Sequence, residues 1–140
     1  AEADAKVVIE VRVPAQVDDA AGKTEASTVL EKEDTIAIYG SNEFAAKAII
    51  NANGGFKESK LGADKILAVG FDSGALQQDA IRKGIFVGSV TQDPVQIGYQ
   101  AVKLAIAAAK GETVKDVDTG SKWYDAKNID SEEIKALLYE

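Results

Sequence analysis

The stretch ILAVGFDSG, residues 66–74, decides how this sequence is interpreted. Its first six residues are apolar or glycine, which is typical of a buried strand, and Asp72 follows directly. A carboxylate at the end of a strand can cap the next helix, act as a catalytic acid or bind a ligand. These three roles differ in what the rest of the chain must provide.

The composition excludes several classes of protein. The 140 residues are 46% hydrophobic, which suits a single domain with its own core. The net charge of −7 disfavours nucleic acid as a partner, because phosphates repel an acidic surface. The absence of Cys and His removes thiol nucleophiles, imidazole bases and the usual zinc or copper ligands. We expect neither a metal nor a cofactor.

The start of the chain carries no predicted targeting segment. The first residues, AEADAK, lack the apolar core of a signal peptide, and the sequence has no run of 18 apolar residues. Met is absent from the whole sequence. We therefore expect this start to follow a cleavage, a processed leader or a truncation.

Segments typical of strands and of helices alternate along the chain. The predicted strands are residues 6–13, 35–40, 65–71 and 85–91. The predicted helices are residues 18–32, 42–53, 73–83, 93–110 and 131–139, and residues 113–124 are predicted to be extended. This alternation predicts an α/β domain with an open parallel sheet and helices on both faces.

Polar side chains follow three of the four predicted strands, where ligands of open α/β sheets bind. Asn42, Asp72 and Gln92 carry planar amide or carboxylate groups, which can hold vicinal hydroxyls. Helix capping is the competing explanation, because Asn and Asp are common where a strand leads into a helix. Capping explains Gln92 least well, since glutamine is a poor cap and Asp93 is adjacent.

Catalytic alternatives find little support. The chain contains neither a GxGxxG nor a GxSxG motif, and no histidine is present to activate Ser73. Glu43 is a candidate second acid for Asp72, although an acid in the first turn of a helix is the simpler interpretation. A response-regulator receiver domain needs an acidic pair directly after its first strand, and here Asp18 and Asp19 come several residues late. We therefore predict that the protein is not an enzyme, with a flavodoxin-like enzyme as the lesser hypothesis.

The ordered set TIAIYGSNE, ILAVGFDSG and SVTQDPVQIGYQAVKLA resembles the C-terminal lobe of sugar-binding proteins of ABC transporters, of the ribose/galactose type. The resemblance runs from about residue 6 to the end, and it makes residues 1–140 a single Rossmann/flavodoxin-like lobe. It implies capture of a small sugar or polyol outside the cytoplasm, in the periplasm or at the cell surface, and delivery to an ABC permease. The effector-binding core of lactose-repressor-like regulators shares the fold and is the alternative, although no basic DNA-reading segment is visible.

The same resemblance assigns roles to particular residues. By matched position, Asn42, Asp72 and Gln92 would hydrogen-bond sugar hydroxyls. Val17, within PAQVD, stands where ribose binders have an aromatic residue, which disfavours ribose itself. Residues 112–129 resemble the segment that crosses the hinge between lobes and returns, so Trp123 and Tyr124 would lie near the cleft or serve a structural role at the hinge.

The family pattern also contains parts that this sequence lacks. The N-terminal lobe is missing, and so is the first strand–helix unit of the C-terminal lobe. In the family's sheet that strand lies between the strands matched by residues 6–13 and 35–40. We therefore expect a gap that the N-terminal lobe or a second chain must fill, whereas a monomer with all four predicted strands in sequence order contradicts this expectation.

Overall fold

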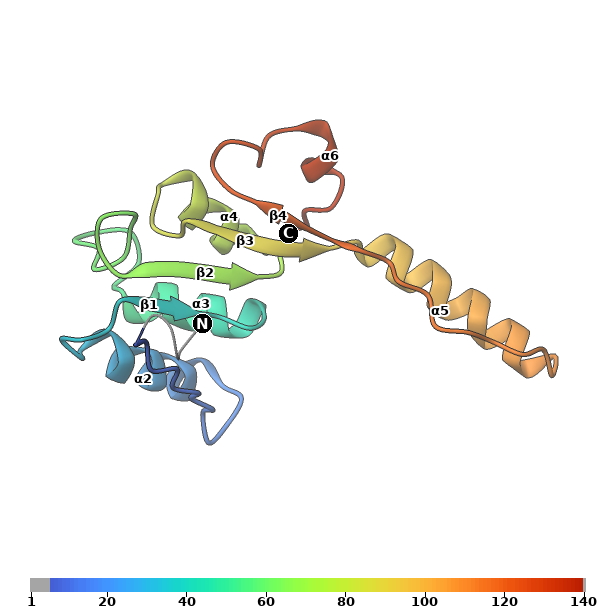
Figure 1. Cartoon of the computed structure of the whole chain (residues 1–140), viewed down its shortest axis with the longest axis horizontal. Coiled ribbons are helices and arrows are strands. Elements are labelled where there is room, and N and C mark those ends of the chain that lie inside the picture. The colour runs from blue at the N-terminus through green and yellow to red at the C-terminus, as the bar shows by residue number, and fades with distance from the viewer. Residues whose placement is uncertain (1–5, 140) are drawn as a thin grey trace.

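The computed structural model describes residues 6–139; residues 1–5, for which no signal-peptide core is predicted, and residue 140 lie outside the described part. Within residues 6–139, four strands and five helices are assigned, and their order along the chain is visible in Figure 1. The strands are β1 (Ala37–Tyr39), β2 (Leu67–Phe71), β3 (Gly88–Gln92) and β4 (Ser121–Tyr124). The helices are α2 (Asp19–Leu30), α3 (Glu43–Ala52), α4 (Ala75–Arg82), α5 (Pro94–Ala109) and α6 (Glu132–Lys135).

The sheet is mixed, with the strand order β1-β2-β3-β4. Strands β1, β2 and β3 are parallel, as predicted, but β4 pairs antiparallel to β3, with Tyr124 opposite Ser89. The prediction of a wholly parallel sheet was therefore wrong at this edge. The reason is visible in Figure 1, where α5 leads away from the end of β3 and the following segment runs back beside α5. Strand β4 therefore begins next to the last residue of β3 and runs in the opposite direction.

Local capping explains where three of the helices begin. The side chains of Asp18, Asn42 and Asp93 accept hydrogen bonds from backbone N–H groups three residues later, at 2.8, 2.9 and 2.8 Å. Pro94 occupies the first turn of α5, where its missing N–H costs no hydrogen bond. These starts confirm the predicted helix positions to within a residue or two.

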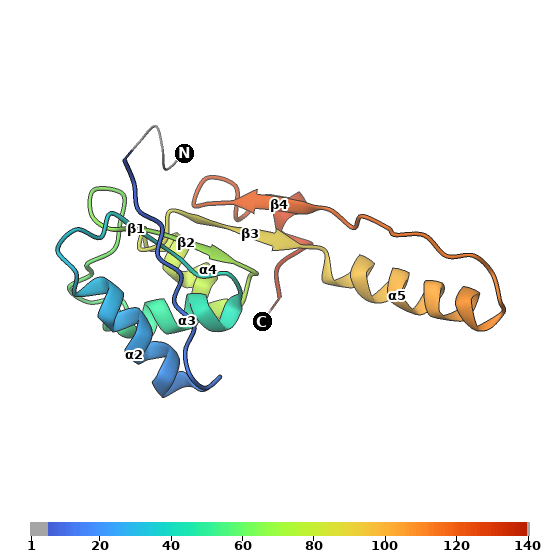
Figure 2. The same ribbon diagram turned by 60° about the horizontal axis from the view of Figure 1, so that its bottom comes forward.

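The helices cover only one face of the sheet (Figure 2). Ala68, Ser89, Thr91 and Tyr124 point to that face and are fully buried, over a core that includes Ile50, Ile81 and Phe86 from α3, α4 and the loop before β3. Both crossovers step in the same direction along the sheet, and right-handed crossovers of that kind place their helices on the same side. The helices that we predicted for the other face are not found among residues 6–139.

The opposite face of the sheet is partly open. The side chains of Tyr39, Leu67 and Trp123 on this face are 57%, 40% and 44% exposed. Isolated apolar residues at a surface need no explanation, but a contiguous apolar sheet face indicates a surface that contacts something else.

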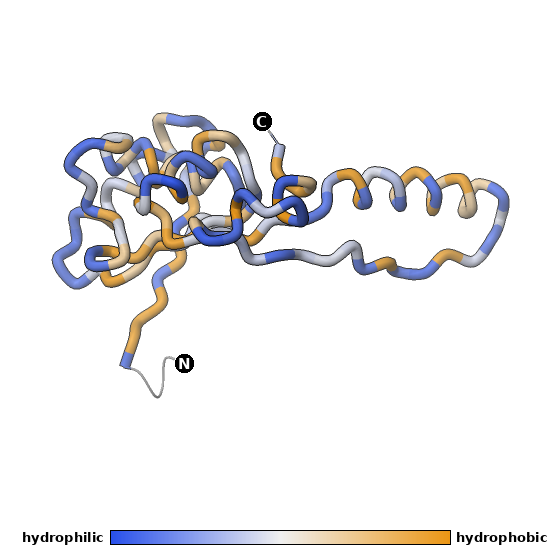
Figure 3. Tube along the Cα trace, turned by 90° about the horizontal axis from the view of Figure 1, so that it is seen from above, coloured by the Kyte–Doolittle hydropathy of each residue, from blue (hydrophilic) through white to orange (hydrophobic). Residues whose placement is uncertain are grey.

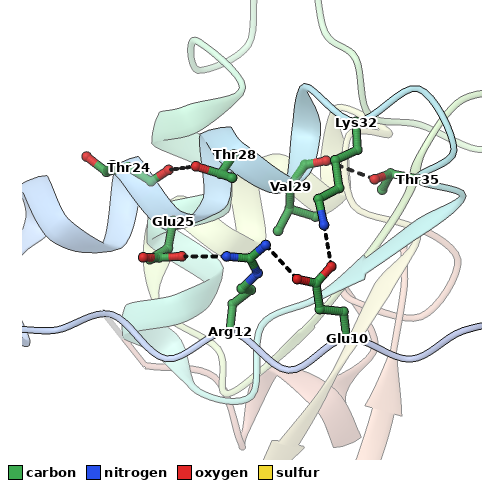
Figure 4. Close-up of polar contacts among 8 residues, drawn as sticks. All are labelled: Glu10, Arg12, Thr24, Glu25, Thr28, Val29, Lys32 and Thr35. Atoms are coloured by element: carbon green, nitrogen blue, oxygen red, sulfur yellow. Dashed lines mark hydrogen bonds and ion pairs between the residues drawn. The ribbon is translucent and has the colours of Figure 1, made fainter.

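Residues 6–13 do not form the predicted strand of the sheet. Instead this segment lies along α2, where Arg12 contacts Glu25 at 3.8 Å and Glu10 forms an ion pair with Lys32 (Figure 4). The Lys32 hydrogen bond is the main cause of a lowered pKa at Glu10. The side chains of Val8, Val11 and Val13 are 79–89% exposed. Residues 6–13 have the sequence pattern of a strand. However, β1 is the edge strand of the sheet, and in the described part of the chain no further strand lies between β1 and this segment to pair with it.

Helix α5 projects from the rest of the molecule (Figures 1 and 3). None of its residues is buried, although its sequence is amphipathic. A stripe of apolar side chains runs along it at spacings of three and four residues and is 52–70% exposed; it consists of Val95, Tyr99, Val102 and Ile106. No helix within residues 6–139 is both long enough and apolar enough to cross a membrane.

Candidate functional site

The carboxyl edge of the sheet gathers the polar residues singled out in the sequence. The arrows of β1, β2 and β3 point the same way in Figure 1, and α3, α4 and α5 begin where these strands end. Asn42 follows β1, Asp72 follows β2, and Gln92 is the last residue of β3. Parallel strands followed by short turns therefore bring all three residues to one edge.

Asp72 connects two of the loops at this edge. Its N–H donates to the carbonyl of Val90 at 2.8 Å, which continues the ladder between β2 and β3. Its Oδ2 accepts a hydrogen bond of 3.0 Å from the N–H of Glu43, the first residue of α3. The side chain is half-buried. The carboxylate thus stabilises the start of α3 with one oxygen, while Oδ1 accepts no hydrogen bond from residues 6–139.

Asn42 is a helix cap, as one of the two interpretations of the sequence predicted. Its Oδ1 accepts from the N–H of Ala45 at 2.9 Å, and the residue is exposed. This bond fixes the orientation of the amide, so that the Nδ2 donors point away from the helix. Capping and ligand binding are therefore compatible, because the cap uses the acceptor and leaves the donors to a ligand.

The side chains of Gln92 and Val17 make no hydrogen bond with Asp72 or Asn42 among residues 6–139. Gln92 is exposed opposite Ser121 and lines a shallow pocket of about 110 Å³ together with Thr119, Gly120 and Leu137. Val17 lies just before α2 and is 86% exposed. Their assignment to a ligand site stays a prediction.

Two further side chains lie at this edge, Glu43, which the sequence offered as a second acid or a first-turn helix acid, and Tyr139, which it did not single out. The carboxylate of Glu43 lies over Gly74, where a Cβ atom would come within 2.2 Å of Oε1, so a glycine permits this close approach. Burial raises the pKa of Tyr139, and the nearby charges of Asp72 and Glu43 add to the increase. The C-terminal segment therefore reaches the same edge, which no motif in the sequence indicates.

Tyr124 lies beneath Asp72 on the helix-covered face of the sheet. It is fully buried, and its hydroxyl donates to the backbone carbonyl of Asp72 at 2.8 Å. Burial raises the pKa of Tyr124 to about 12. The hydroxyl therefore keeps its proton near neutral pH and acts as a donor. Sequence analysis placed Tyr124 either near the cleft or in a structural role, without this contact.

The chemistry available at this edge is hydrogen bonding. Asp72 offers an acceptor and Asn42 offers donors, a combination that suits neutral hydroxyl groups. Within residues 6–139 no three carboxylates gather closely enough to hold a metal ion.

An open α/β lobe with amide and carboxylate side chains along the carboxyl edge of its strands has the architecture of a ligand-binding lobe. Residues 2–113 match the family model described as "Periplasmic binding protein domain". The chain belongs to this family.

Solved structures similar to the chain include sugar-binding proteins. A protein from Brachyspira murdochii, described as "ABC transporter, LacI family transcriptional regulator", is 44% identical over 95% of this chain and 44% of its own, with a TM-score of 0.82. An ABC transporter solute-binding protein from Agrobacterium vitis with bound D-fucose is 28% identical over 99% of this chain and 47% of its own, with a TM-score of 0.83. A carbohydrate transporter solute-binding protein from Agrobacterium radiobacter in complex with D-arabinose is 28% identical over 87% of this chain and 41% of its own, with a TM-score of 0.74.

The chain therefore spans less than half the length of these three structures. No curated protein sequence matches the chain.

Proposed function

We propose that the chain is one lobe, the C-terminal one, of a two-lobe sugar-binding component of an ABC transporter. The observation that carries this proposal is the bond between Oδ2 of Asp72 and the N–H of Glu43, which joins the loops after β1 and β2 at the carboxyl edge. Family membership and the sugar complexes of its relatives support the same function. The lobe binds and does not catalyse, and it works outside the cytoplasm, in the periplasm or at the cell surface.

The ligand of this lobe is a small sugar or polyol. Asp72 accepts hydrogen bonds from its hydroxyls and Asn42 donates to them, with Gln92 and Val17 completing the lobe's share of the site. The relatives that are 28% identical bind D-fucose and D-arabinose, which makes these two sugars the first to test. The aliphatic Val17 offers no aromatic face to a pyranose or furanose ring, which argues against ribose.

Closure of a second lobe over this edge would trap the sugar, and the closed form would be recognised by the permease. Residues 112–129 would form the hinge crossing and return. The path of the chain supports this assignment, because α5 leads away from the end of β3 and the segment after it runs back beside α5 to join the sheet as β4 (Figure 2).

A thermal-shift experiment with pentoses, hexoses and polyols tests the ligand class. We expect one sugar, at millimolar concentration, to stabilise the chain, because a half site makes few contacts and binds weakly. At ten times Kd the stabilisation is about 1.4 kcal/mol, which raises Tm by roughly 5 °C for a domain of this size. Stabilisation by flavin or nucleotide, without any sugar effect, would contradict the proposal.

The exposed apolar surfaces support a partner that completes the cleft and the sheet. These surfaces are the stripe on α5, the open face of the sheet and the valine-rich segment 7–13. Exposed groups of apolar side chains of this kind are typical of protein interaction sites. The partner is the N-terminal lobe or, when that lobe is absent, a second copy of this chain.

Sedimentation velocity tests whether the stripe on α5 is a contact surface. We expect the isolated chain to self-associate at high micromolar concentration, and Val102→Glu to weaken association at least tenfold, because it would place a charge in an apolar contact. Gln100→Glu adds the same charge to another side of the same helix and is expected to leave association unchanged. Equal behaviour of the two variants would show that the stripe makes no contact.

A second candidate function is the effector-binding core of a lactose-repressor-like regulator. The 44%-identical relative, whose description includes "LacI family transcriptional regulator", favours it. A sugar response is common to both functions, so DNA binding distinguishes them. The net charge of −7 argues against binding by this part of the molecule, and a gel-shift experiment with the full-length gene product decides the question.

A further inference from the structure

The backbone of Asp72 is held in an uncommon conformation. Its φ of 75° lies in the left-handed region, which residues other than glycine seldom adopt, although Asp and Asn tolerate it better than most. Glycine would occupy this position without strain. The side chain therefore stays at some cost to the backbone, and the surrounding structure must hold the peptide in place.

Three buried side chains donate hydrogen bonds to one atom, the carbonyl oxygen of Asp72. The hydroxyl of Tyr124 lies at 2.8 Å, Nε2 of Gln77 at 3.0 Å and the hydroxyl of Ser89 at 3.0 Å. All three residues are at most 2% exposed, and they come from β4, α4 and β3. Hydrogen bonds shielded from water in this way hold a group firmly, because no solvent competes for it.

The sequence makes room for this arrangement at Gly70. A Cβ atom at Gly70 would lie 2.3 Å from Nε2 of Gln77 and 3.1 Å from Oγ of Ser89. The same Nε2 also donates to the carbonyl of Phe71 at 3.2 Å. If the Gln77 amide were turned by 180°, its Oε1 would face the carbonyl oxygens of Phe71 and Asp72. These two neighbours therefore determine the orientation of the amide.

We propose that Tyr124, Gln77 and Ser89 are positioning residues that hold the Asp72 peptide so that its carboxylate lies at the start of α3 and faces the ligand edge. Rotation of Asp72 to an ordinary φ would move its carbonyl away from the three donors and its carboxylate away from Glu43. The inference rests on the proposed function of Asp72, which is to bind a sugar. It adds a layer of buried side chains behind Asp72, on the helix-covered face of the sheet.

The test compares Tyr124→Phe with Tyr39→Phe in the whole chain. Each variant loses one hydroxyl, but Tyr39 is 57% exposed and does not donate to Asp72. We expect Tyr124→Phe to shift the backbone NMR resonances of Asp72 towards values typical of negative φ. We also expect it to weaken binding of D-fucose or D-arabinose, whichever stabilises the wild-type chain, roughly threefold to tenfold. Tyr39→Phe is expected to change neither.

Ser89→Ala, which removes the smallest of the three donors, provides the same two measurements if Tyr124→Phe does not fold. Unchanged Asp72 resonances and unchanged affinity in a folded variant would overturn the proposal, even if its Tm is lower. A wild-type chain that binds no sugar would count against the proposed function alone. The resonances of Asp72 would still decide whether the buried hydroxyls hold its backbone.

Discussion

Replacing Asp72 with glycine is expected to reduce sugar affinity by about tenfold to a hundredfold while changing Tm by only a few degrees. The loss of affinity follows from removing a charged acceptor, since a hydrogen bond to a charged group contributes about 1.5–3 kcal/mol. Stability changes little because two effects oppose each other. Glycine relieves the strain of φ 75°, and the N–H of Glu43 loses its bond to Oδ2.

Asp72→Asn is the matched variant for this experiment. Asparagine also tolerates positive φ and keeps an acceptor for the N–H of Glu43, but it carries no charge. Isothermal titration calorimetry with the sugar identified by thermal shift should therefore rank the affinities as wild type, then Asp72→Asn, then Asp72→Gly. Wild-type affinity in Asp72→Gly would mean that the carboxylate serves only as a cap for α3.

Local rules predicted the parts of the fold that local chemistry determines. The caps Asn42 and Asp93, the start of α2 beside Asp18 and the apolar strand β2 follow from residue types within a few positions of one another. The carboxyl edge followed in turn, because strand–helix alternation by itself determines where the loops meet. Asp72 was identified in this way before any contact was known.

Long-range partners explain what the sequence did not reveal. Residues 6–13 have the pattern of a strand, but a strand forms only where a neighbour pairs with it, and the nearest sheet edge at β1 does not reach it. The antiparallel entry of β4 depends on the path of residues 111–120 beside α5. The three donors to the Asp72 carbonyl come from positions 77, 89 and 124, a separation that no motif spans.

Gly40→Ala is expected to be the most destabilising single-methyl change in the region of the site. Gly40 lies between β1 and α3, and its N–H donates to the carbonyl of Val69 at 2.9 Å, which attaches it to β2. A Cβ atom here would lie 2.6 Å from the backbone N and 2.8 Å from the Cα of Ala46. Backbone atoms cannot rotate away as a side chain can, so α3 must shift. Overpacking of this kind costs about 1–3 kcal/mol or more, which lowers Tm by roughly 10 °C.

The stability of Gly40→Ala can be measured by thermal or urea unfolding, and Gly98→Ala is the control. Beyond the neighbouring backbone of its own helix, nothing lies within 4 Å of a Cβ atom at Gly98 in α5. Alanine is also the better helix former, so the variant should be as stable as the wild type or slightly more stable. Gly40→Ala should also weaken sugar binding in the protein that remains folded at low temperature. The reason is that a shift of α3 carries Asn42 and the N–H of Glu43 away from Asp72. A Gly40→Ala variant with wild-type Tm and wild-type affinity would show that α3 does not pack closely against Gly40 at the end of β1. The geometry of the site would then need another explanation.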